Sequence, residues 1–257
     1  MFSLQYTDLI VFCFLFIEVD HYLKMTSWIW IWHTLYLLIA LLSLTYCEQL
    51  LNNRPIIGIL AQNITRPTPG VNGSSYIVAS YVKFLESAGA RVVPIPTSLK
   101  EEELKYLFSR INGLLLPGGD CAFETSKYYQ HAALFFKWAV QATDEGDYFP
   151  IWGTCQGFQT LTEIVAGTDS IMSPSNSWNT AWPLNLTENF HGSRMFSDMS
   201  EKLQKSIQIE SLTYNAHQNC VTPDAFYRQK ELSSFYKVLS LNNDLSGKTF
   251  ISTIEGK

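Results

Sequence analysis

Residues 148–167 contain the feature that most restricts the fold of this chain. The apolar run Tyr148-Phe149-Pro150-Ile151-Trp152 leads directly into Gly153-Thr154-Cys155-Gln156-Gly157, and the apolar positions of a helix follow. A buried strand, the pattern G-x-C-x-G and a helix are typical of a nucleophile elbow, here with cysteine in place of serine. Unpaired N–H groups at the start of that helix would favour the thiolate. We therefore predict that Cys155 is a catalytic nucleophile; the alternative is a buried structural cysteine.

Strand-like and helix-like segments alternate from Arg54 to the elbow. The expected strands are 55–61, 91–96, 113–117 and 149–153, and the expected helices are 76–88, 101–110 and 126–143. Such βαβ units predict an α/β fold, a doubly wound, mostly parallel sheet with helices on both faces. Beyond Gly167 the pattern changes to shorter strand-like pieces, 182–186 and 209–214, and to a hairpin of 236–241 and 249–254. We expect one domain.

Charge and cysteine content exclude several classes of protein. The 257 residues include 18 basic and 23 acidic side chains, a net charge of -5, without a Lys/Arg cluster, so no nucleic-acid partner is expected. The five cysteines are scattered singly, which excludes both a zinc site and a dense disulfide framework. Cys121 and Cys220 either pair or stay reduced, and the sequence leaves both alternatives open.

The first 47 residues read as a leader. An apolar stretch at 35–44 suits the h-region of a signal peptide, and Met25 stands where an initiator would. The alternative is a signal anchor over 28–44. Three glycosylation sequons, at Asn63, Asn72 and Asn185, suit a lumenal protein. We expect cleavage near Cys47, contact with a membrane only transiently through the leader, and a place in the secretory pathway.

Two further parts of a site with a cysteine nucleophile are expected at the carboxyl edge of the sheet, where ligands of α/β folds gather. The loop Leu116-Pro117-Gly118-Gly119-Asp120 can direct N–H groups at a substrate oxygen, and with the N–H of Gln156 it would form an oxyanion hole. An ordinary Pro-Gly turn is the alternative. A base is also needed. His217 is a better candidate than His191, although a surface role suits either, and His131 is expected to face solvent or its own helix.

These segments together resemble the γ-glutamyl hydrolases (folylpolyglutamate hydrolases), within the class-I glutamine amidotransferase-like superfamily. The resemblance runs from about Arg54 to the last residue. It rests on R-P-I-I-G-I-L at 54–60, S-Y-I-V-A-S-Y-V-K-F-L-E-S-A-G-A-R-V-V-P-I at 75–95, L-L-L-P-G-G at 114–119, W-G-T-C-Q-G-F-Q at 152–159 and F-I-S-T-I-E-G at 250–256.

The resemblance implies a flavodoxin-like core without cofactor or metal. It implies cleavage of γ-glutamyl bonds in folate and antifolate poly-γ-glutamates, through a thioester on Cys155. Gly119 and Gln156 would supply the oxyanion contacts, and His217 would assist substrate binding or catalysis. A lysosomal or secreted location and a homodimer are further implications.

One departure from the family concerns its catalytic histidine. The family continues after S-T-x-E-G into W-H-P-E, which provides that histidine and its orienting carboxylate, and this sequence has no W-H-P-E. General acid–base help of this kind is typically worth 10²–10⁴-fold in rate. We therefore expect a hydrolase domain at 48–257 that is incomplete at its C-terminus. The alternatives are a non-catalytic truncated isoform or pseudoenzyme, and a glutamine amidotransferase-type domain, against which the leader argues.

Overall fold

The computed structural model describes residues 35–37, 52–65 and 72–257. From Asn53 to Lys257 the chain forms one compact unit, which contains every element discussed below. The predicted leader lies outside the described residues except for 35–37, which are helical. Within the described ranges, no helix is both long enough and apolar enough to cross a membrane.

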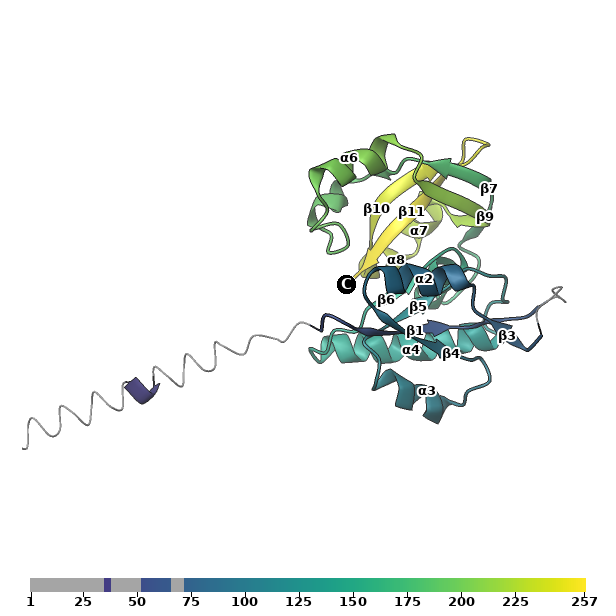
Figure 1. The fold of residues 1–257 in the computed structure, drawn as a ribbon. Coiled ribbons are helices and arrows are strands. Elements are labelled where there is room, and N and C mark those ends of the chain that lie inside the picture. Colours follow the sequence, from purple (N-terminus) through teal and green to yellow (C-terminus); the bar gives the residue numbers. More distant parts are fainter. Residues whose placement is uncertain (1–34, 38–51, 66–71) are drawn as a thin grey trace, which may run out of the picture. The chain divides into compact units, whose positions relative to one another are not determined.

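A four-stranded parallel sheet forms the first half of this unit. It consists of β1 (Ile56–Leu60), β4 (Arg91–Ile95), β5 (Gly113–Leu116) and β6 (Ile151–Gly153), in the order β4-β1-β5-β6. The strands alternate with α2 (Ala79–Ser87), α3 (Glu101–Phe108), α4 (Lys127–Asp144) and α5 (Gln156–Ala166). Figure 1 shows α3 and α4 on one side of the sheet and α2 on the other. The predicted α/β fold with helices on both faces is confirmed.

A short antiparallel pair extends the carboxyl end of β1. β2 (Gln62–Asn63) pairs with β3 (Ser75–Tyr76), with Gln62 opposite Tyr76. The sequence analysis did not predict this pair. It fixes Gln62 and Asn63 beside the loops that leave β4 and β5, at the edge where the functional residues were expected.

The second half of the unit is antiparallel. Its elements are β7 (Met172–Trp182), β8 (Asn185–Leu186), the 3-10 helix η1 (Glu188–Gly192), α6 (Glu201–Ile209), β9 (Thr213–Val221), α7 (Pro223–Arg228), α8 (Lys230–Phe235), β10 (Tyr236–Asn243) and β11 (Thr249–Gly256). β7 pairs with β9, and β11-β10-β8 form a second sheet. The predicted terminal hairpin is confirmed as β10 and β11. The predicted strand at 209–214 is wrong, because α6 ends at Ile209 and β9 begins at Thr213.

Two apolar clusters hold the unit together, and α5 contributes to both. Leu161 belongs to the cluster formed by the parallel sheet with α3 and α4. Phe158 and Val165, on the same helix, pack against the cluster formed by α7, α8, β10 and β11. The hydroxyl of Tyr236 donates to the Leu161 carbonyl oxygen at 3.2 Å. The helix that follows Cys155 is therefore fixed from both sides.

Candidate active site

Cys155 occupies the predicted turn between β6 and α5. Its backbone has φ 55° and ψ -113°, a conformation that L-residues rarely adopt. Holding a non-glycine residue in such a region costs about 1–3 kcal/mol, so the surrounding structure must enforce it. The strained turn leaves the Cys155 residue exposed to solvent. The strand, sharp turn and helix of a nucleophile elbow are thus all present.

The two glycines of the elbow are required by backbone contacts. A Cβ atom on Gly153 would lie 2.6 Å from the carbonyl oxygen of Gly157, and a Cβ atom on Gly157 would lie 2.0 Å from the carbonyl oxygen of Leu116. The Thr154 N–H donates to that same Leu116 oxygen at 3.0 Å. Because these neighbours are backbone atoms, they cannot rotate away from a side chain. The start of α5 can approach β5 this closely only without side chains at both positions.

Two backbone amides converge on the Cys155 thiol. The backbone amides of Gly119 and Gln156 both act on the sulfur in the direction that lowers its pKa. Although the residue as a whole is exposed, the protein atoms around its sulfur desolvate the thiolate, and this effect is stronger than that of the amides, so the thiol pKa is raised above its ordinary value. The helix therefore favours the thiolate, as expected, but does not by itself produce it at neutral pH. These are the two amides named as oxyanion contacts in the sequence analysis.

Three side chains that the sequence analysis missed support the loop between β5 and α4. The Tyr81 hydroxyl accepts from the Gly118 N–H at 2.9 Å. The carbonyl oxygen of Pro117 accepts from the Tyr128 hydroxyl at 2.9 Å and from Gln62 Nε2 at 3.1 Å. Gln62 is 2% exposed. A polar residue directly after the apolar strand 56–60 was the available signal for it.

The Gln156 side chain attaches this loop to the elbow. Its Oε1 accepts from the Cys121 N–H at 3.0 Å, and its Nε2 donates to the Cys121 carbonyl oxygen at 2.5 Å. The Cys121 thiol in turn donates to Gln62 Oε1 at 2.7 Å. Cys121 and Cys220 are both free thiols, which settles the alternative that the sequence left open in favour of the reduced form.

His217 lies on β9, opposite Ser177 of β7. Its Nδ1 is 3.0 Å from the carbonyl oxygen of Asn219, which also accepts from Gln159 Nε2 on α5. Its Nε2 is 3.2 Å from Asn215 Oδ1. Burial lowers the His217 pKa. The imidazole is thus tied to the helix that follows Cys155, but the groups that shift the Cys155 pKa are the two amides, with no imidazole among them.

The remaining predicted positions make other contacts or are exposed. His191 is part of η1, where its ring packs against Phe190. Asn72 and Asn185 are exposed. Asn63 is half-buried and its amide is engaged, because Nδ2 donates to Thr97 Oγ1 at 3.1 Å. Across the part of the chain that the structure describes, no His, Cys, Asp and Glu side chains form a group that could hold a metal ion.

The model of one protein family, Peptidase C26, matches residues 55–221, which include the sheet, the elbow and the strand of His217. The chain belongs to the peptidase C26 family. Relatives include the gamma-glutamyl hydrolases of Homo sapiens, 42% identical over 79% of this chain, and of Rattus norvegicus, 43% identical over 80%. Gamma-glutamyl hydrolase B of Dictyostelium discoideum is 36% identical over 87%. The matched part spans 63%, 64% and 65% of these relatives, respectively.

A solved structure supports the fold of this C26 member independently. The glutaminase domain of Trypanosoma brucei CTPS, with bound acivicin, superimposes with a TM-score of 0.50 and 13% sequence identity. The match covers 79% of this chain and 81% of that one. The glutamine amidotransferase-like fold implied by the sequence resemblance is thereby confirmed.

Proposed function

We propose that this peptidase C26 member hydrolyses γ-glutamyl bonds with Cys155 as the nucleophile. The observation that carries the proposal is the convergence of the Gly119 and Gln156 amides on the Cys155 sulfur at the strained elbow. Preorganised N–H groups aimed at one point are suited to a developing oxyanion. The names of the relatives support γ-glutamyl bonds as the bonds cleaved.

In the proposed reaction the Cys155 thiolate attacks the carbon of the γ-amide carbonyl. The carbonyl oxygen becomes negative and accepts hydrogen bonds from the N–H groups of Gly119 and Gln156. The C–N bond then breaks, the amine leaves with the proton that the thiol gave up, and a thioester remains. Water attacks the thioester carbon, which releases the γ-carboxylate and restores the thiol. Loss of one oxyanion donor typically costs about 10²–10³-fold in kcat.

His217 is the proposed assisting group, and its surroundings support a second candidate function. Both ring nitrogens lie within hydrogen-bonding distance of backbone or amide oxygens of Asn219 and Asn215. Burial also raises the pKa of the Cys155 thiol. A protein that binds poly-γ-glutamates at this site without cleaving them is therefore the second candidate. A glutamine amidotransferase activity has no comparable support beyond the shared fold.

The natural substrate, location and assembly are also proposals. We propose folate and antifolate poly-γ-glutamates as substrates, the secretory pathway with the lysosome or the extracellular space as the location, and a homodimer as the assembly. The exposed side chains of Asn72 and Asn185 leave two of the three sequons accessible to a glycosyltransferase.

The direct test is hydrolysis of a fluorogenic γ-glutamyl peptide by the chain from Glu48 to Lys257. Its α-glutamyl isomer serves as substrate control, and Cys121→Ala serves as the matched thiol control. We expect cleavage of the γ-linked peptide alone, abolished by Cys155→Ala and retained in Cys121→Ala. If Cys155→Ala hydrolyses the peptide as fast as the parent protein, Cys155 is not the nucleophile. Tight binding of the γ-linked peptide without hydrolysis by any variant would support the second candidate.

A further inference from the structure

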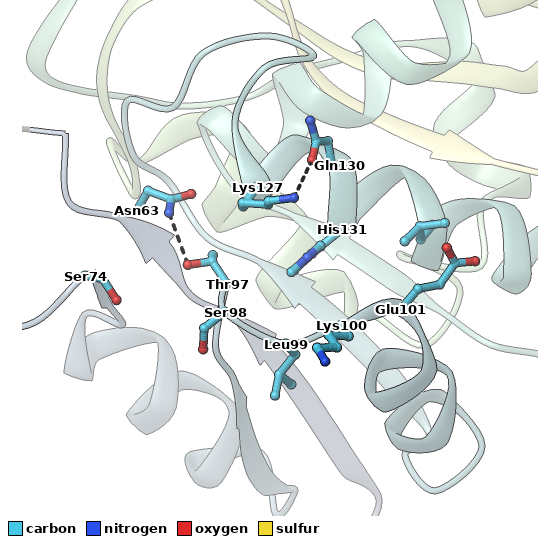
Figure 2. A pocket seen from close by; sticks show the side chains of 11 residues that line it. Asn63, Ser74, Thr97, Ser98, Leu99, Lys100, Glu101, Lys127, Gln130 and His131 are labelled. Atoms are coloured by element: carbon cyan, nitrogen blue, oxygen red, sulfur yellow. Dashed lines mark hydrogen bonds between the residues drawn. The ribbon is translucent and has the colours of Figure 1, made fainter.

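A hollow that is not lined by Cys155 lies at the carboxyl end of β4. Its cavity of about 580 Å³ lies between the loop that follows β4, the start of α3 and the first two turns of α4. Figure 2 shows side chains from these three segments around it. Nine of its eleven lining residues have polar side chains, among them Thr97, Ser98, Lys100, Glu101, Lys127 and His131.

His131 indicates that this hollow receives a ligand. The residue is 5% exposed, yet its Nδ1 atom is buried without a hydrogen-bond partner. Of the two surroundings that the sequence analysis expected for His131, solvent is wrong, whereas neighbours on its own helix, such as Lys127, are present. A buried polar atom left unpaired costs about 1–3 kcal/mol, so such an atom beside a cavity needs an explanation. Burial and nearby Lys127 lower the His131 pKa, which keeps the imidazole neutral.

The other polar groups of the hollow favour a negatively charged ligand. Lys100 and Lys127 are exposed and belong to different elements. Lys127 Nζ donates to Gln130 Oε1 at 3.2 Å, a neutral partner that does not compensate the positive charge. Glu101 is the only carboxylate among the lining residues. Two ammonium groups and the hydroxyls provide the donors that a carboxylate or phosphate accepts, and His131 Nδ1 adds one more in the tautomer that carries the proton there.

The hollow is connected to the thiol through adjacent residues. Asn63 lines it, donating from Nδ2 to Thr97 Oγ1 at 3.1 Å and accepting at Oδ1 from the Tyr128 N–H at 3.3 Å. Its neighbour Gln62 packs so closely on Gly119 that a Cβ atom there would lie 2.3 Å from Gln62 Cδ. Both sites therefore open at the carboxyl edge of one sheet.

We propose that this hollow binds an α-carboxylate of the poly-γ-glutamate chain whose γ-bond lies at Cys155. The identity of the ligand rests on the proposed function. β4 and β6 are separated by three strand spacings in the order β4-β1-β5-β6, or about 14 Å. A γ-glutamyl repeat has five main-chain bonds and extends about 6 Å. A carboxylate roughly three residues from the cleaved bond therefore reaches the hollow.

The test is calorimetric binding of penta-γ-glutamate to the full chain carrying Cys155→Ala, in which turnover is blocked. The double change Lys100→Ala and Lys127→Ala should weaken binding at least about tenfold, as expected for lost charge-assisted hydrogen bonds. The control is Lys137→Ala, which removes an exposed lysine of α4 outside the hollow. His131→Leu should also weaken binding, but without lowering the melting temperature, because it removes an unpaired polar atom.

Equal affinity of the double-lysine variant and the Lys137→Ala control would overturn the proposal. Lysine-dependent binding of inorganic phosphate, with no binding of penta-γ-glutamate, would also overturn it and identify a phosphate site. The proposed function is decided separately by hydrolysis in the Cys155-containing protein. If the enzyme is active but its affinity for penta-γ-glutamate does not depend on Lys100 and Lys127, only the proposal for the hollow is refuted. If binding depends on these lysines but the protein hydrolyses no γ-glutamyl substrate, only the proposed cleavage is refuted.

Discussion

Replacing Gly157 by alanine tests the contact that forms the elbow. The new Cβ atom would lie 2.0 Å from the Leu116 carbonyl oxygen and 2.8 Å from the Leu116 Cβ atom. The distance between a carbon and an oxygen atom in contact is normally at least about 3.3 Å. The helix start and β5 must therefore separate by roughly 1.3 Å, if the contact is to reach that distance.

The cost follows from three contributions. Over-packing typically costs about 1–3 kcal/mol, and the upper end applies because backbone rather than a flexible side chain must move. Displacing Leu116 also weakens the hydrogen bond from the Thr154 N–H, worth about 0.5–1.5 kcal/mol. The better helix propensity of alanine offsets up to about 1 kcal/mol of this destabilisation. We expect a net loss near 3 kcal/mol, which lowers the melting temperature of a domain of this size by about 6–12 °C.

Thermal unfolding followed by circular dichroism measures this loss, and Gly192→Ala is the matched control. A Cβ atom on Gly192 meets no atom within 4 Å, so its melting temperature should stay within about 2 °C of the parent. Alkylation of Cys155 provides a second readout, since displacement of the Gln156 amide should slow it. If Gly157→Ala has the same melting temperature as Gly192→Ala, the elbow does not depend on this contact and the reasoning is wrong.

Three further results are expected. Cys155→Gly should melt above Cys155→Ala, because glycine relieves the φ of 55°; equal melting would show that the turn is unstrained. Iodoacetamide should modify Cys155 at a rate that still rises above pH 9, because burial raises the thiol pKa; a plateau near pH 7 would contradict that direction. Burial, with Asp169 nearby, raises the pKa of Glu163 to about 7, so the folded state retains a proton that the unfolded state releases above pH 4.5. Stability should therefore fall between pH 5 and 7, and Glu163→Gln, but not the exposed Glu102→Gln, should remove this fall in melting temperature.

The sequence predicts the elbow and the parallel sheet because both rest on local signals. β1, β4, β5 and β6 are short apolar runs separated by helical patterns, and Gly153 and Gly157 stand at a fixed spacing from Cys155. The expected strands contain the observed ones, with end differences of one or two residues. The two amides that we expect to contact the oxyanion could be named because their loops leave adjacent strands of one sheet.

Other features depend on pairing between distant residues and were missed for that reason. β7 and β9 are polar and partly exposed, so their pairing leaves no alternating apolar pattern. The burial of His131 follows from the packing of α4 on α3 and on the loop after β4, which no local window contains. Gln62 supports Pro117 across 55 residues of chain. In each case a polar side chain is satisfied, or left unsatisfied, by tertiary contacts.

Leu116, the last residue of β5, connects the elbow to the loop that carries Gly119. Its carbonyl oxygen accepts from Thr154 and contacts Gly157, which fixes the elbow, and its own chain continues three residues on to the Gly119 amide. The sulfur and both candidate oxyanion amides therefore take their positions relative to β5. Phe158 and Val165 of α5 also pack against the antiparallel half, so the placement of the elbow depends on both halves of the unit. Substitutions at this contact should therefore alter kcat as well as KM.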